Sequence, residues 1–302
     1  MKEKKTAIVT GGTKNQFPAI AVLALNIADK CPNIADELVI FHDGVSVEEQ
    51  QKIKKIFPTR FIEYKSPFMD NTEFTNTISN YFSLMVFCKY ECWKLLDEYS
   101  CVIWSDYDIL ILKDISEINI KGKQSSKFIQ KKYLISKFEK NIFWDFDYLL
   151  NDFNPMGDCI SCGIFVLYDN FPKYLDFYRQ CLKLTQDFAP VLWLPEEGII
   201  SILLQKENIK YDNIDEFVYA TPRKEYKKYI SISKIIHSVG QPKFWNDFEN
   251  LDWNEYYYHW INEYKGMPFE KSKKQKNNYI KKIIKYLLPY GLIRFYQKIK
   301  QN

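Results

Sequence analysis

The chain has 302 residues, of which 46% are hydrophobic and 26% are charged, and this composition excludes intrinsic disorder, collagen and low-complexity classes. The net charge of +4 comes from ten Lys or Arg among residues 271–302, which contain no Asp or Glu and so leave a net charge of −6 on residues 1–270. Because nucleic-acid binding needs cations clustered over the domain itself, we expect no nucleic-acid partner.

Short apolar strands alternate with helical patterns in the first half of the chain, which predicts an α/β fold with a mainly parallel sheet. The expected strands cover residues 6–10, 37–43, 60–64 and 101–108, and the expected helices cover residues 18–30, 47–57 and 80–99. The strand CVIWSDYD at 101–108 is predicted to be central, buried and terminated by carboxylates. Ligands of open α/β sheets bind beyond the carboxyl ends of such strands, so we expect the binding site there.

The pattern changes in the second half of the chain. Residues 116–157 have weak periodicity, which predicts an insertion or a mobile segment. Regular patterns return with strands at 159–169 and 233–240 and helices at 173–186 and 196–205. Cys159 and Cys162 form a CxxC, but no second pair stands at zinc spacing and the context CISCGIFVLY favours a core strand. The seven cysteines favour a reducing compartment, and no apolar run reaches the roughly 18 residues that a membrane span requires.

Asp106-Tyr107-Asp108 is the first candidate site. Two carboxylates separated by one residue can converge on a hard divalent cation where the chain leaves strand geometry. The alternative for an isolated pair is an acidic turn at the end of a strand. The hydrophobic strand before it favours the metal site, because a charge at the end of a buried strand needs a partner.

The second candidate site is the segment HSVGQPKFW, residues 237–245, which also follows an apolar strand. It combines the imidazole of His237, a glycine at 240 that permits close backbone approach, and the ammonium group of Lys243. These groups suit a metal and a diphosphate. With three histidines in the chain, we do not expect a zinc site built from several of them.

Together these two segments resemble glycosyltransferase family 8, in which a strand-terminal DxD and a later HxxGxxKPW hold Mn²⁺ and a UDP-sugar. Phe244 stands where the family usually has Pro. The resemblance covers about residues 6–245 and implies a GT-A fold, which is a Rossmann-like nucleotide-diphospho-sugar transferase fold. It also implies a retaining enzyme whose metal ligands are Asp106, Asp108 and His237, with Mn²⁺ preferred and Mg²⁺ as the substitute.

The resemblance further implies donor-binding residues, some with departures from the family pattern. Lys89 occupies the place of an Arg that reaches the donor, so the charge is kept and the bidentate fork is lost. Ser161 replaces an Asn that contacts a sugar hydroxyl group. The remaining implied contacts are Gly240 and Lys243 with the diphosphate, Asp106 with the ribose, and the strand edge at Thr10 and Gly11 with the uridine.

Glu196-Glu197-Gly198 occupies the position of the family's Asp-Gln-Asp. Glu197 would be either a nucleophile or a carboxylate that stabilises an oxocarbenium-like centre during same-face substitution. Glu196 is the competing candidate for the catalytic carboxylate.

The expected function is transfer of a hexose, from UDP-galactose or UDP-glucose, to a lipid-linked saccharide such as lipooligosaccharide. One alternative is a non-catalytic sugar-nucleotide or glycan-binding protein at the membrane surface. Another is a haloacid-dehalogenase-like phosphatase, although Leu110 stands where that class needs Thr or Val. Aromatic residues in 143–153 and 253–260 could line an acceptor groove, with core packing as the alternative.

The basic end of the chain predicts a membrane-associating tail at residues 266–302, following a catalytic domain at residues 1–265. Apolar side chains recur there at helical spacing while lysines occupy the other side: Ile280, Ile283, Ile284, Leu287 and Leu288 against Lys281, Lys282 and Lys285. A helix packed on the body is the alternative. We expect a cytoplasmic protein bound peripherally to the inner face of the cytoplasmic membrane through this tail.

Overall fold

The computed structural model describes residues 4–71, 74–75, 78, 83–119, 125–138, 153–246 and 250–270. One compact unit spans Met1–Met267, and a second unit spans Pro268–Asn302. The amphipathic helix predicted in residues 266–302 lies outside the described residues, so this tail and its boundary stay predictions.

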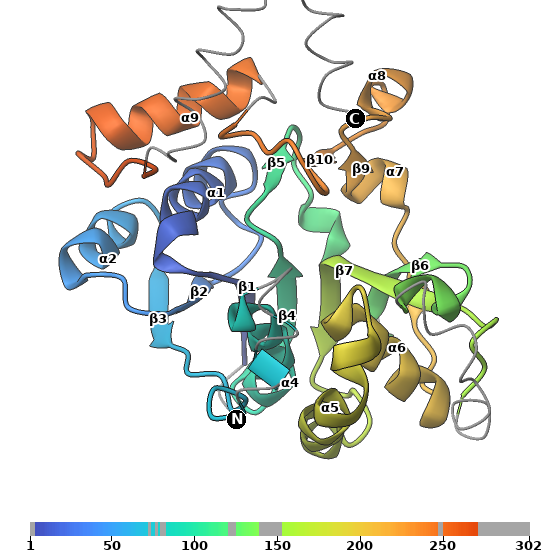
Figure 1. Ribbon diagram of the computed structural model, residues 1–302. Helices are drawn as coiled ribbons and strands as arrows, with labels where there is room; N and C mark the ends of the chain where they lie inside the picture. Colours follow the sequence, from blue (N-terminus) through green and yellow to red (C-terminus); the bar gives the residue numbers. More distant parts are fainter. Residues whose placement is uncertain are drawn as a thin grey trace, which may run out of the picture. The chain divides into compact units, whose positions relative to one another are not determined.

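The centre of the compact unit is a seven-stranded sheet with the strand order β3-β2-β1-β4-β7-β6-β8 (Figure 1). Its strands are β1 (Lys5–Gly12), β2 (Glu37–His42), β3 (Thr59–Glu63), β4 (Tyr99–Ser105), β6 (Lys127–Lys131), β7 (Cys159–Tyr168) and β8 (Asp212–Asn213). β1 to β4 pair in parallel, β6 and β8 also pair in parallel, and β7 runs antiparallel to β4 and β6. The predicted α/β fold with a mainly parallel sheet is confirmed.

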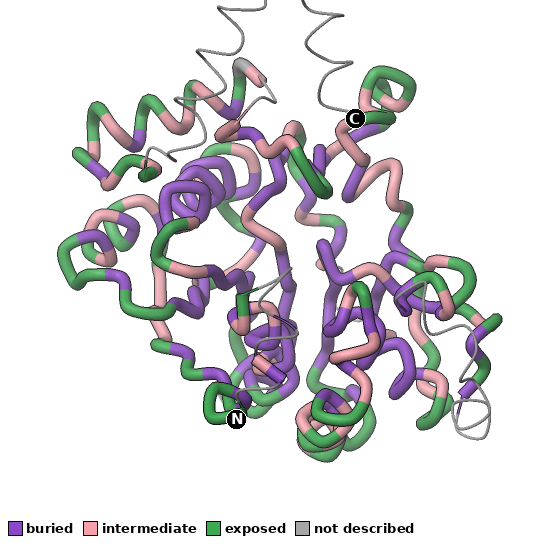
Figure 2. Tube along the Cα trace, viewed as in Figure 1, coloured by how far each residue is buried: buried purple, intermediate pink, exposed green. Residues whose placement is uncertain are grey.

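Helices cover both faces of this sheet. The longer ones are α1 (Phe17–Lys30), α2 (Val47–Lys54), α5 (Tyr174–Phe188), α6 (Pro195–Lys206) and α9 (Leu251–Asn262). Successive side chains of β4 point to opposite faces, so Trp104 joins the core beneath α5 and α6 whereas Ile103 joins the core beneath α1. The central strands are buried along most of their length (Figure 2).

A second, three-stranded sheet has the order β5-β10-β9, from β5 (Ile109–Ile111), β10 (Ile235–His237) and β9 (Thr221–Pro222). β5 follows β4 after a turn and is tied to α1, because the buried Asn26 side chain bonds both the N–H and the carbonyl of Ile111. β10 pairs antiparallel with β5, and this pairing joins the two segments that the sequence singled out.

Two sequence-based predictions are corrected. The helix expected at 80–99 is instead a 3₁₀ helix, η2 (Leu84–Tyr90), followed by α4 (Glu91–Leu95), and β4 already begins at Tyr99. The segment 116–157 is not wholly an insertion, because β6 within it pairs with β7 in the central sheet. The strand was missed because a register shift between Phe128 and Ile129 and a buried lysine at 127 interrupt its apolar alternation.

The CxxC is a structural feature. Cys159 and Cys162 lie in β7, and all seven cysteines are buried and free. The predicted core strand is therefore confirmed. Among the helices in the described part of the chain, none is long and apolar enough to cross a membrane.

Candidate active site

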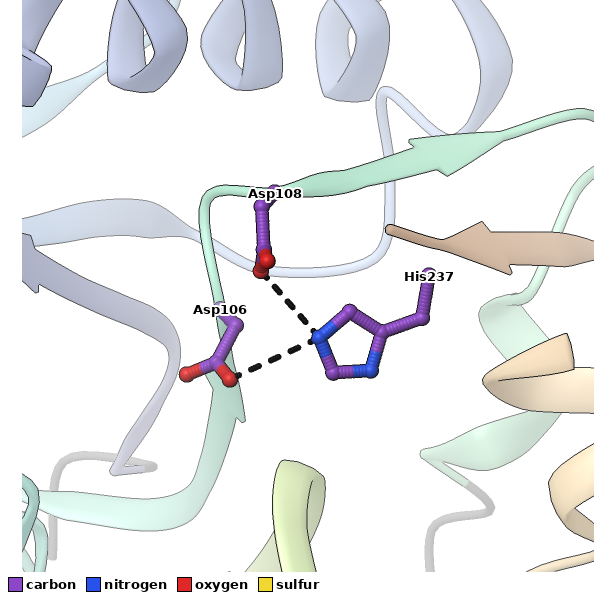
Figure 3. Close-up of side chains that lie close together, drawn as sticks. All are labelled: Asp106, Asp108 and His237. Atoms are coloured by element: carbon purple, nitrogen blue, oxygen red, sulfur yellow. Dashed lines mark hydrogen bonds and ion pairs between the residues drawn. The ribbon is translucent and has the colours of Figure 1, made fainter. Parts of the chain in front are cut away.

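Asp106, Asp108 and His237 meet where the two sheets join. Asp106 continues the β4–β7 ladder by one step, since its N–H donates to the carbonyl of Gly163 at 2.9 Å. The chain then turns so that β5 begins at Ile109, and the β5–β10 register places His237 opposite Ile109. As a result, His237 Nε2 lies 3.1 Å from an Asp108 carboxylate oxygen and 3.7 Å from an Asp106 carboxylate oxygen (Figure 3).

The three side chains fit a divalent cation. One ligand atom from each lies within 4.8 Å of the other two, and a set of two carboxylates and one imidazole suits Mn²⁺. The imidazole also packs directly against Gly163. A Cβ atom at that position would lie 2.6 Å from a ring carbon of His237, so a glycine is required for the imidazole to reach the carboxylates.

Asp108 is the most enclosed of the three. Ser238 donates its N–H and its hydroxyl group to the Asp108 backbone carbonyl, and the Lys243 ammonium group pairs with the Asp108 carboxylate and also bonds the Ser238 carbonyl at 2.9 Å. Burial alone would raise the pKa of Asp108, but His237 and Lys243 outweigh it and hold the pKa well below its usual range. The carboxylate is therefore ionised, which is the state in which it can ligate a cation.

Lys89 links the candidate metal ligands to the pair of glutamates. Its Nζ lies 2.8 Å from Glu196 Oε1 and 3.2 Å from Asp106 Oδ1, and it sits 5.5 Å from the Trp104 ring centroid. The Trp104 indole N–H donates to the same Asp106 oxygen at 2.9 Å. Burial lowers the pKa of Lys89, but the two carboxylates outweigh it and raise the pKa well above its usual value. Lys89 is thus charged.

Glu196 and Glu197 lie in the first turn of α6, where the helix dipole favours negative charge, and both are buried. Burial raises the pKa of Glu196, and Lys89 offsets this only in part. In Glu197 the effect of burial is overcome by Lys137, so its pKa is lowered. Glu196 Oε2 has no hydrogen-bond partner among the described residues, whereas Glu197 Oε1 has two partners and Glu197 Oε2 has one.

The other predicted donor residues lie near this centre, with differing surroundings. Thr10 and Gly11 lie near the end of β1, and a Cβ atom at Gly11 would lie 2.5 Å from the Cys88 sulfur atom, so close packing already requires this glycine. Ser161 donates its hydroxyl group to Glu197 at 3.0 Å. Gly240 has a φ of +69°, a conformation that favours glycine. Contacts of these residues with a nucleotide stay predictions.

Four further residues shape the site and received no role from the sequence, although two of them lie within the motifs that resemble the family: Trp104, Lys137, Gly163 and Ser238. Trp104 could have been identified from the sequence, because residues i and i+2 of a strand share a face, which places its indole within reach of Asp106. No sequence pattern indicates a role for Lys137, because its segment lacks periodicity and its partner Glu197 lies 60 residues further on.

The comparisons with known proteins agree with this geometry. A sequence model described as Glycosyl transferase family 8 matches residues 7–249. The chain belongs to this family. It is therefore a glycosyltransferase, a class that takes a sugar from a nucleotide-sugar donor to a saccharide acceptor, and the phosphatase alternative is set aside. No curated protein matches the chain.

Solved structures of glycosyltransferases share the fold. The bifunctional glycosyltransferase WbbM superposes with a TM-score of 0.60 at 14% identity over 88% of this chain, which spans 50% of WbbM. The galactosyltransferase LgtC, solved with donor and acceptor sugar analogues, gives a TM-score of 0.60 at 11% identity over 90% of this chain and 99% of LgtC. GlyE of Streptococcus pneumoniae gives 0.54 at 13% identity, over 90% of this chain and 66% of GlyE. The predicted GT-A fold is confirmed.

Proposed function

We propose that this family 8 member is a metal-dependent, retaining hexosyltransferase that uses a UDP-sugar, with UDP-galactose or UDP-glucose as the donor. The observation that carries the proposal is the convergence of Asp106, Asp108 and His237 from two sheets, with the Lys243 ammonium group against Asp108. A centre of this charge and composition suits a cation bound together with a diphosphate.

The reaction needs stabilisation of a diphosphate leaving group. Mn²⁺, when bound, supplies Lewis-acid stabilisation of the charge that develops on the departing UDP. Asp106, Asp108 and His237 would hold the cation. Lys243, whose ammonium group pairs with Asp108, would contribute a further positive charge to the same phosphates.

Glu197 is the carboxylate that we assign to the reacting sugar. Its pKa is lowered, whereas burial raises the pKa of its neighbour Glu196, which Lys89 connects to Asp106. Retention of configuration requires either attack by this carboxylate or its stabilisation of an oxocarbenium-like centre. Glu196, with one oxygen unpaired among the described residues, would bind a donor hydroxyl group.

We further propose that the acceptor is a lipid-linked saccharide, such as lipooligosaccharide, at the inner face of the cytoplasmic membrane. The ten cations of residues 271–302 support this proposal, because each cation near an anionic leaflet adds about 1 kcal/mol of attraction. The tail would hold the enzyme beside an acceptor that cannot leave the bilayer.

The test is a panel of UDP-hexoses and UDP-N-acetylhexosamines, scored by UDP release with Mn²⁺ and again with EDTA. We expect one UDP-hexose to be consumed fastest, and only with the cation. Binding of UDP-sugars without release of UDP from any of them would favour the non-catalytic alternative. Equal release in EDTA would contradict the metal assignment.

Replacement of Lys243 by Ala should mainly impair use of the donor. The substitution removes a charge from the diphosphate but leaves the carboxylates of the glutamate pair in place, so we expect KM for the UDP-sugar to rise by about 10-fold or more, with a smaller change in kcat. Lys234→Ala is the matched control, because Lys234 pairs with Glu117 away from the site. An unchanged KM in Lys243→Ala would show that the diphosphate does not contact this lysine.

Deletion of residues 271–302 should release the protein from vesicles that contain phosphatidylglycerol but leave UDP-sugar hydrolysis largely intact. Co-sedimentation with anionic and with neutral vesicles measures this binding. A full-length variant with Lys281, Lys282 and Lys285 replaced by Gln should bind less strongly than the wild type, which separates loss of charge from loss of chain. Unchanged binding after the deletion, or loss of folding, would contradict a membrane-binding tail.

A further inference from the structure

A buried ion pair joins Lys137 to Glu197. Lys137 ends the 3₁₀ helix η4 (Leu134–Lys137), and its Nζ lies 2.5 Å from Glu197 Oε2. The two side chains are 7% and 11% exposed. Lys137 lies in a segment next to the central sheet and Glu197 lies in the first turn of α6, so the ion pair is a tertiary contact between distant parts of the chain.

The backbone fixes Lys137 relative to α6. Its carbonyl oxygen accepts hydrogen bonds from the N–H groups of Trp193 and Leu194, at 2.7 and 3.3 Å, immediately before α6 begins at Pro195. A bridge between Phe138 and Leu192 extends this connection. The position of the lysine is therefore set by the same segment that starts the helix carrying Glu197.

The hydrogen bonds of Glu197 with the described residues leave one lone pair of its carboxylate free. Oε1 accepts from the Cys162 N–H at 2.8 Å and from the Ser161 hydroxyl group at 3.0 Å, which uses both of its lone pairs. Oε2 accepts from Lys137 alone among the described residues. The remaining lone pair on Oε2 is thus the one available to a reacting sugar, and Lys137 holds the oxygen that carries it.

We propose that Lys137 is a positioning residue for the transfer reaction: it holds Glu197 ionised and fixes the orientation of Oε2. This inference rests on the proposed function, in which Glu197 faces the donor sugar. Lys137 does not itself contact the described candidate metal ligands, so it would act through Glu197 and not through the diphosphate.

Other charged and titratable groups surround Glu197. Burial and the adjacent Glu197 raise the pKa of Glu196, Lys89 lowers the pKa of Glu197 from η2, and the thiols of Cys159 and Cys162 lie nearby on β7. Burial raises the pKa of Cys162 well above its usual value, so that thiol is neutral. Lys137 is the largest influence that lowers the pKa of Glu197. Burial lowers the pKa of Lys137 itself, but the Glu197 carboxylate outweighs burial and raises it.

The test starts with Lys137→Gln, which keeps a hydrogen-bond donor and removes the charge. With the preferred UDP-sugar, kcat should fall by about 100-fold while KM stays within about threefold. Because a buried carboxylate without its cation has a raised pKa, the acid limb of the kcat profile should move to higher pH by about one unit or more. Lys137→Arg should restore most of the activity, and Lys131→Gln, which breaks a half-buried pair with Glu216, should change little.

The decisive comparison repeats Lys137→Gln in a Glu197→Gln background. There the substitution at 137 should alter kcat by less than about twofold, since a residue that acts through Glu197 has nothing left to act on. The inference would be overturned if the decreases in kcat of the two single variants multiplied in the double variant. It would also be overturned if the acid limb of the kcat–pH profile of Lys137→Gln did not shift.

Urea unfolding gives a readout that needs no donor. In Lys137→Gln the folded-state pKa of Glu197 rises above its unfolded value, so the loss of stability should be larger at pH 8 than at pH 5. This pH dependence should vanish in the double variant. If it is absent from the single variant, the ion-pair inference fails. If it is present but no UDP-sugar is consumed by the wild type, the proposed function fails instead.

Discussion

Asp108→Ala and His237→Ala should each lower Mn²⁺-dependent UDP release by more than about 100-fold. Loss of a residue that only orients a metal ligand costs about 10- to 100-fold, so loss of a ligand itself should exceed this range. Steady-state UDP release, measured at several Mn²⁺ concentrations, gives the effect. EDTA should abolish the activity of the wild-type protein to the same extent.

The structural cost of these substitutions must be separated from the catalytic one. Removal of Asp108 leaves His237 and Lys243 without their shared carboxylate, and breaking a buried charge pair costs about 3–5 kcal/mol of stability. Asp108→Asn preserves the shape of the side chain, and Asp114→Ala removes an exposed carboxylate from the same segment as a control. Wild-type activity of the Asp108 and His237 variants in EDTA would refute the metal site.

Glu197→Gln should lower kcat for sugar transfer by about 100-fold or more and change KM little. The carboxylate is the ionised group that we assign to the reacting sugar, and a neutral amide supplies no negative charge at the oxocarbenium-like centre and is a weaker nucleophile. Single-turnover transfer, measured by rapid quench, reports the chemical step directly.

The control for this substitution is Glu207→Gln at the other end of α6, where the side chain is exposed. Loss of the Glu197 charge also leaves Lys137 without its partner, so the Lys137→Gln, Glu197→Gln double variant identifies any effect of an unpaired lysine. Transfer at the wild-type rate by Glu197→Gln would exclude a nucleophile role and show that the carboxylate charge is dispensable.

The parts of the fold that could be predicted are those in which the local pattern of apolar residues agrees with the structure that forms. β4 is a continuous apolar run with parallel β1 beside it, and its burial made the carboxylates that follow it conspicuous. The Asp106-Tyr107-Asp108 turn and the segment from His237 onward could each be identified separately. Their contact depends on the antiparallel pairing of two three-residue strands, β5 and β10, which local pattern does not reveal.

The parts that could not be predicted depend on long-range pairing. Burial of Lys127, Lys137 and Lys89 contradicts the ordinary expectation that lysine faces solvent, and each is accommodated by a partner distant from it in sequence or outside its own element. The prediction of one helix at 80–99 was wrong for a related reason. η2 has a 3₁₀ conformation that brings Lys89 towards Asp106 and Glu196, a tertiary requirement with no signature in helical periodicity.

Calorimetric titration of the protein with UDP, in Mn²⁺ and in EDTA, tests the central claim most directly. We expect one UDP to bind per chain in Mn²⁺, and we expect its affinity to fall by about 100-fold or more both in EDTA and in Asp108→Asn, because cation and diphosphate bind as a unit at Asp106, Asp108 and His237. UDP binding of equal strength with and without the cation, or unchanged in Asp108→Asn, would contradict the account.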